Sequence, residues 1–173
     1  MGPAPGADPV RHYLEVLADK TGSLVATSAR FGATFAGIDE DLVGALTAFG
    51  EEVGVAFQIS DDLLDIVSEG GASGKQPGTD LREGIATLPA LFVLAGDDPA
   101  DGRLRELVSA PVTDDADHAE ALALLRASSG LTRATQVLVE YADRARARLE
   151  AVPPGEVRDA LSALCDYVVT RTS

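Results

Sequence analysis

The sequence has little of what secreted and membrane-spanning proteins rely on. It contains one cysteine, Cys165, which excludes an internal disulfide and fits a reducing cytosol. No uninterrupted apolar run approaches the roughly 20 residues that a membrane span requires. The Pro/Gly-rich beginning also lacks the apolar segment of a signal peptide. We therefore expect a cytoplasmic protein without a membrane span.

Positive charge is also scarce. The chain has 28 acidic and 14 basic residues, and its net charge is −14. Such a balance argues against a nucleic-acid partner and against docking on anionic lipid. Only two of the basic residues are lysines, Lys20 and Lys75, and the others are arginines. An acidic protein that binds an anionic ligand needs metal ions or well-placed cations, so these two lysines merit separate consideration.

The apolar pattern predicts helices throughout. A chain of 173 residues suits one domain, with residues 1–8 as a linker or an artificial boundary and 9–173 as the folded part. We find no internal repeat and no convincing strand-like alternation. The fold class is therefore predicted to be all-α, a helical bundle. The first expected helix is Pro9–Ala36, ended by Gly37, and the second is Glu40–Val67, with Asp39 as its N-cap. A short helix is expected at 87–95, with Pro89 in its first turn, and two more at 101–108 and 114–128. Gly130 is expected to break the pattern before a helix that runs to about Glu150, and a last helix follows Pro153-Pro154.

Helical periodicity also predicts which faces are apolar. The first helix has a stripe of Leu14, Leu17, Leu24, Phe31 and Phe35, with small residues that allow a close neighbouring helix. The helix 40–67 should bury Leu42, Leu46, Phe49, Val53, Ala56, Phe57 and Leu64. His118 and Glu120 are expected on the polar side of their helix. Residues 68–84, rich in glycine and polar residues, are expected to form a long loop, and such loops are often functional.

Three aspartates stand out within the helix 40–67. Asp61, Asp62 and Asp65 share a helical arc about 100° wide with Gln58, and they are the only charged residues between Val53 and Val67. A solvated helix face would favour Glu, Lys and Arg over Asp, which is a poor helix former. Because Mg²⁺ prefers one or two carboxylates together with phosphate oxygens and water, the pattern indicates an open metal site for a diphosphate.

The two lysines fit such a ligand. Lys20, followed by Thr21, lies in the apolar arc of the first helix, where an ammonium group either extends to solvent or binds phosphate oxygens. Lys75 lies in the loop that directly follows the acidic helix, between glycines that permit close approach to a ligand. A Gly-Lys pair alone is a weak signal, and the nucleotide-binding P-loop pattern is absent.

Taken in order, these segments resemble the trans-isoprenyl (polyprenyl) diphosphate synthases. The matching segments, between about His12 and Leu94, are Lys20-Thr21, Phe57-Gln58-x-x-Asp61-Asp62-x-x-Asp65, Gly74-Lys75-x-x-Gly78-x-Asp80-Leu81-Arg82-Glu83-Gly84 and Thr87-Leu88-Pro89. The aspartate motif alone is not specific, whereas the whole ordered set is. The helices after Leu94 carry no motif.

The resemblance implies the C-terminal half of the isoprenoid synthase fold. It implies that Asp61, Asp62 and Asp65 form the second Asp-rich motif and bind Mg²⁺ that bridges to the diphosphate. It further implies that Lys20 and Lys75 bind the allylic diphosphate, and that Thr21 and Gln58 border the reacting carbons. The implied reaction condenses isopentenyl diphosphate with an allylic diphosphate. Metal and lysines stabilise the charge that develops on the leaving group.

Two departures from the family pattern matter. The family's first Asp-rich motif and its isopentenyl diphosphate site lie in its N-terminal half, and no second cluster of that type occurs here; Asp97-Asp98 and Asp114-Asp115 fit helix caps. Ile85 also stands where many relatives have a lysine. We therefore expect a fragment that is inactive alone and that forms a homodimer or associates with the missing half.

Other functions remain open at this point. The chain could be a non-catalytic or regulatory partner subunit of a heteromeric prenyl synthase, or a helical interaction module with a decayed site. A terpene cyclase fits the Lys-Thr pair and the Gly-Lys loop less well. A di-iron bundle would need Glu-x-x-His pairs, which are absent from the sequence.

Overall fold

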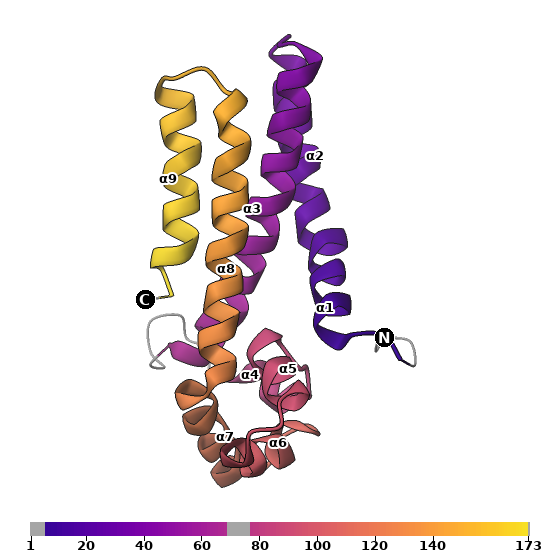
Figure 1. Ribbon diagram of the computed structural model, residues 1–173, viewed down its shortest axis with the longest axis vertical. Coiled ribbons are helices and arrows are strands. Elements are labelled where there is room, and N and C mark those ends of the chain that lie inside the picture. Colours follow the sequence, from indigo (N-terminus) through magenta and orange to yellow (C-terminus); the bar gives the residue numbers. More distant parts are fainter. Residues whose placement is uncertain (1–5, 69–76, 173) are drawn as a thin grey trace. The chain divides into compact units, whose positions relative to one another are not determined.

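The computed structural model describes residues 6–68 and 77–172, and it confirms the predicted all-α class within them (Figure 1). None of these described residues belongs to a strand. The helices are α1 (Pro9–Leu17), η1 (Ala18–Gly22), α2 (Ser23–Phe35), α3 (Glu40–Val67), α4 (Thr79–Glu83), α5 (Leu88–Ala95), η2 (Pro99–Asp101), α6 (Gly102–Val108), α7 (Asp115–Ala127), α8 (Ser129–Arg148), η3 (Leu149–Ala151) and α9 (Glu156–Thr170).

The chain divides into two compact units. Unit 1 comprises residues 1–13 and 61–136, and unit 2 comprises residues 14–60 and 137–173. Helices α1, α3 and α8 each contribute residues to both units. The predicted limits of the folded part, 9–173, remain a prediction.

The first helix differs from its prediction in one respect. It is interrupted at Ala18–Gly22 by a π-helical turn, η1, in which the backbone N–H of Ser23 reaches back to the carbonyl of Ala18. Lys20 and Thr21 lie in this turn. The interruption coincides with residues of the family motif. Single π-turns within helices occur frequently at functional sites.

Helix α3 has the predicted bounds and a wide buried surface. Asp39 accepts a hydrogen bond from the N–H of Leu42 at 2.9 Å, which confirms it as the N-terminal cap. Of the residues expected in the core, Phe49, Val53 and Ala56 are buried, and Leu42, Leu46 and Leu64 are half-buried. Phe57 is exposed, so its prediction is wrong, and the guanidinium of Arg171 lies over its ring, 4.2 Å from the centroid.

By length and apolar composition, α3 also qualifies as a candidate membrane span. This helix contains no long uninterrupted apolar run, because polar and acidic residues interrupt its apolar sequence. Core helices of soluble proteins meet the same criterion, so it does not by itself overturn the prediction.

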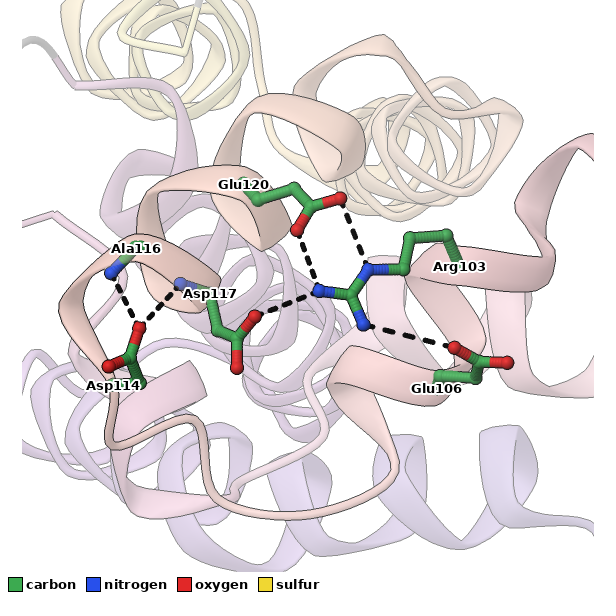
Figure 2. Close-up of polar contacts among 6 residues, drawn as sticks. All are labelled: Arg103, Glu106, Asp114, Ala116, Asp117 and Glu120. Atoms are coloured by element: carbon green, nitrogen blue, oxygen red, sulfur yellow. Dashed lines mark hydrogen bonds and ion pairs between the residues drawn. The ribbon is translucent and has the colours of Figure 1, made fainter.

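Unit 1 has its own hydrophobic core. Its buried residues come from α3 to α7 and the segment between α6 and α7: Ile66, Leu81, Ala90, Val93, Leu104, Leu107, Val108, Val112, Ala121, Leu122 and Leu125. At its surface, Arg103 of α6 donates to Asp117 and Glu120 of α7 at 2.7–2.8 Å, while Asp114 caps α7 by accepting from the N–H groups of Ala116 and Asp117 (Figure 2).

Three predictions for this region are wrong. The loop 68–84 contains the short helix α4, which begins after Gly78 and ends before Gly84, both with positive φ. His118 is buried, not on the polar side of α7. Gly130 lies inside α8, where a Cβ atom would come within 2.5 Å of the Pro89 carbonyl. The break between α7 and α8 falls at Ser128, whose backbone is extended.

In unit 2, helix crossings depend on small residues, as the composition of the first helix indicated. A Cβ atom on Gly50 would lie 2.8 Å from the Cα of Ala26, and one on Gly54 would lie 2.9 Å from the Cα of Gly22. Backbones that approach this closely leave room for hydrogen only. After η3, α9 returns alongside α8 (Figure 1), where Arg146 pairs with Asp166 at 2.7 Å.

Candidate functional site

The acidic end of α3, in unit 1, is the centre of the candidate site. Asp61, Asp62 and Asp65 are all half-buried, whereas a solvated helix face would expose them. Between them lies Leu63, which is 1% exposed and anchors this turn in the interior. The three carboxylates therefore occupy the edge of a buried helix, as the arc of charged residues predicted.

Tyr13 of α1 holds one of these carboxylates. Its hydroxyl donates a hydrogen bond to Oδ2 of Asp62. Burial, followed by the charge of Asp62, raises the pKa of Tyr13 well above its ordinary value. The phenol therefore stays protonated and remains a donor at any physiological pH.

Asp65 is held from the other side of the loop. Its backbone carbonyl accepts the N–H of Gly78 at 2.7 Å, and its Oδ2 accepts the N–H of Asp80 at 3.3 Å. These two contacts bring the N-terminal end of α4 against the last turns of α3. The Gly78-x-Asp80 segment thus acts through its backbone, which no side-chain motif in the sequence could indicate.

His118 and Arg126 of α7 brace the same region. Nε2 of His118 lies 2.9 Å from the carbonyl oxygen of Gly78. Because a carbonyl only accepts, this ring nitrogen carries the proton. Arg126 donates to the carbonyls of Ile66 and Ser68 at 2.7 and 3.0 Å. It satisfies acceptors at the C-terminus of α3, where a cation is favourable.

The donor set suits an open metal site and not a closed one. Within residues 6–68 and 77–172, no three His, Cys, Asp or Glu side chains converge on a common point that could hold a metal ion. A Mg²⁺ ion that keeps its waters and binds substrate phosphates needs only one or two carboxylates. Three half-buried aspartates on one arc of a helix therefore fit the group that the sequence implies.

Thr21 and Gln58 meet in unit 2. The hydroxyl of Thr21, in η1, donates to Oε1 of Gln58, in α3, at 2.9 Å. The two side chains thus fix each other's orientation at the crossing where Gly22 and Gly54 touch. Lys20, in the same π-turn, is exposed. The sequence predicted a role for Lys20, Thr21 and Gln58, and the structure shows a hydrogen bond between Thr21 and Gln58.

The predictions for Lys75 and Ile85 concern the segment after α3. Lys75 and Gly74 lie outside the described residues, so their predicted role stays a prediction. Ile85 is 49% exposed, and its N–H bonds to the carbonyl of Asp80 at 2.9 Å. The hydrophobic side chain at this position therefore faces solvent while its backbone closes the turn after α4.

Arg171, the residue that follows the C-terminal helix α9, supports α3 immediately before the aspartates. Nε of Arg171 donates to Oγ of Ser60 at 2.6 Å, and its other guanidinium nitrogen donates to the carbonyl of Phe57 at 2.8 Å. Ser60 is fully buried, so this charged donor satisfies a hydroxyl that would otherwise cost stability. The sequence assigned no such role to α9.

Comparisons with known proteins agree with this picture. Residues 5–125 match the family model described as polyprenyl synthetase. The chain is 48% identical to the nonaprenyl diphosphate synthase of Mycobacterium tuberculosis over 98% of this chain and 51% of that protein. It is 35% identical to heptaprenyl diphosphate synthase component 2 of Geobacillus stearothermophilus, over 94% of this chain and 50% of that protein.

A solved structure gives the same result. The geranylgeranyl pyrophosphate synthase of Corynebacterium glutamicum, solved with calcium and isoprenyl diphosphate, superposes with a TM-score of 0.91 at 39% identity, covering 98% of this chain and 53% of that one. The chain thus spans about half the length of the curated relatives it matches. With its all-helical structure and its ordered motifs, the chain belongs to the polyprenyl synthetase family.

Proposed function

We propose that this chain provides the allylic-diphosphate half of a polyprenyl diphosphate synthase. The intact enzyme would condense isopentenyl diphosphate with an allylic diphosphate, with loss of diphosphate and a proton. The observation that carries the proposal is the half-buried aspartate triad at the end of α3, in a chain of this family. A relative solved with calcium and isoprenyl diphosphate supports the ligand class.

Asp61, Asp62 and Asp65 are the residues that would hold divalent metal, and Mg²⁺ is the ion we propose. When bound, Mg²⁺ supplies positive charge for the diphosphate leaving group. Lys20 and Lys75 are the residues that we propose for binding of the allylic diphosphate. The hydroxyl of Thr21 and the amide of Gln58, which orient each other, would offer dipoles to the allylic carbon chain without a nucleophile that traps a cation.

A binding experiment tests the ligand and the triad together. The probe is a thiodiphosphate analogue of an allylic diphosphate, titrated calorimetrically into the chain with and without Mg²⁺. We expect binding that depends on Mg²⁺ and is lost when Asp61, Asp62 and Asp65 are all replaced by Asn. Glu140→Gln, which removes a charge from an exposed position on α8, is the control and should bind normally. Metal-independent binding, or binding by the triple variant, would overturn the proposal.

Turnover is expected to require more than this chain. The sequence contains no second Asp-rich cluster of the family type, so the rigorously pure 173-residue protein should not convert isopentenyl and allylic diphosphates. Activity should return on mixing with a polypeptide that carries the first Asp-rich motif. Turnover by the chain alone would contradict this expectation.

A second candidate function is that of a subunit in a heteromeric prenyl synthase. It is favoured by one relative, which is named component 2 of a heptaprenyl diphosphate synthase. This function predicts a stable complex with a separate partner polypeptide, detectable when the chain is purified from its own cells. We propose a cytoplasmic location in either case, in keeping with the free, buried Cys165.

Self-association is proposed as well, by burial of the apolar face of α2. Leu24, Phe31 and Phe35 are 67%, 59% and 88% exposed, and apolar surface of this kind is seldom left bare. Because both copies are strongly acidic, added salt should leave a homodimer unchanged or tighten it by screening the repulsion. Sedimentation across a salt series measures this, and a monomer at micromolar concentration or dissociation with rising salt would count against it.

A further inference from the structure

We infer that Tyr13 is a positioning residue for the metal-site carboxylate of Asp62. The inference deepens the proposed function and rests on it, because Asp62 acts as a ligand only if the triad binds metal. The sequence motif does not include Tyr13, which lies seven residues before Lys20.

The argument begins with what meets at the hydroxyl. The phenol donates to Oδ2 of Asp62. This one hydroxyl thus links α1 to the acidic end of α3, and Tyr13 and Asp62 both lie in unit 1.

This geometry orients the carboxylate of Asp62. With Oδ2 bound to the phenol, rotation of the carboxylate about its terminal bond is restricted. Asp65 is treated in the same way by a backbone N–H from Asp80, also at one oxygen, Oδ2. Ligands oriented by outer hydrogen bonds hold metal more tightly, and loss of such a partner typically lowers affinity 10- to 100-fold.

A hydrophobic role alone does not account for this arrangement. Phenylalanine would fill the same volume, whereas the hydroxyl in a half-buried position adds a polar group that must be satisfied. The hydroxyl is satisfied by its donation to the carboxylate of Asp62. The hydroxyl therefore has a specific task, and removing it tests that task with little change in packing.

The test measures metal binding at individual residues and not activity. Mn²⁺ is titrated into the ¹⁵N-labelled chain, and the concentration that half-broadens the backbone amide signals of residues 61–65 is recorded. We expect Tyr13→Phe to raise this concentration about tenfold. The acidic surface around Asp117 and Glu120, where Arg103 is bound (Figure 2), serves as an internal reference and should broaden equally in both proteins. Tyr141→Phe, a change of the same kind on α8, should behave as the wild type.

Double variants separate positioning from a general effect on structure. If Tyr13 acts through Asp62, Tyr13→Phe should have no further effect in an Asp62→Asn background but should keep its effect in Asp65→Asn. An equal effect in both backgrounds would overturn the inference. So would unchanged broadening in Tyr13→Phe when Asp62→Asn weakens binding. If Asp62→Asn itself changes nothing, the proposed metal site fails instead.

A measurement on the unaltered hydroxyl covers the case in which Tyr13→Phe does not fold. In the wild type, the Tyr13 hydroxyl proton should give a downfield, slowly exchanging NMR signal, as expected for a buried hydrogen bond to an ionised carboxylate. This signal should be lost in Asp62→Asn. Its absence from the wild type, or its persistence in Asp62→Asn, would overturn the inference.

Discussion

Two glycines of α3 should respond in opposite ways to the same substitution. Gly44 has nothing within 4 Å of an added Cβ, so Gly44→Ala should stabilise the protein by about 0.5–1 kcal/mol through helix propensity alone. At Gly54 the added Cβ would lie 2.9 Å from Gly22 Cα and 3.2 Å from the Thr21 carbonyl oxygen. Backbone atoms cannot move aside as a flexible side chain does, and overpacking of this kind costs roughly 1–3 kcal/mol.

After the propensity gain is subtracted, Gly54→Ala should destabilise the protein by about 1–2 kcal/mol. The two variants should therefore differ by about 2 kcal/mol in the free energy of unfolding, measured by urea denaturation followed by circular dichroism. The helix crossing also positions Thr21 against Gln58, so the side-chain amide signals of Gln58 should shift in Gly54→Ala and stay in place in Gly44→Ala. Equal stabilities for the two variants would refute this account of the crossing.

Three further changes have expected outcomes. Gly78→Ala should cost about 2–4 kcal/mol of unfolding free energy, because φ is +76° and the new Cβ would lie 2.7 Å from Nε2 of His118. Gly37→Ala is the control. Its φ is +69° but the space around it is open, so it should cost only the backbone strain of about 1–2 kcal/mol. Arg126→Met should cost about 1 kcal/mol in urea denaturation, since two carbonyls at the end of α3 lose their donor; an unchanged midpoint would contradict this. Cys165 is fully buried, and burial also raises the pKa of its thiol. A thiol reagent should therefore label it only when the protein opens, and rapid labelling of the native protein would show the reasoning to be wrong.

Local sequence signals predicted much of the fold. Helix α3 was predicted with its observed bounds because Asp39 gives a clear start and twenty-eight residues run without Pro. The residues of Thr21-x₃₆-Gln58 were singled out by family resemblance, and the structure places them in contact. Asp98 and Asp114 were interpreted as caps, and both accept backbone N–H bonds at their helix starts. Each of these features is encoded within a few neighbouring residues or in a motif.

The features that were missed depend on contacts between distant segments. The π-turn η1 changes the face that Lys20 presents relative to a regular helix, and no residue type specifies such a turn. His118 was assigned to the polar side because its helix pattern is acidic nearby, yet its partner is the carbonyl of Gly78, forty residues away. Tyr13 and Asp62 are forty-nine residues apart. Periodicity describes only the faces of one helix, so it could not reveal these pairings.

The choice of donors around the aspartates has a further physical consequence. Asp62 receives one hydrogen bond from a phenol and Asp65 one from a backbone amide, and both of these donors are neutral. A neutral donor orients a carboxylate and leaves its negative charge in place, whereas an arginine at the same distance would orient it and offset much of the charge that attracts a divalent cation. These two bonds therefore orient carboxylates of the motif without lowering their attraction for a metal ion, in a chain whose net charge is −14.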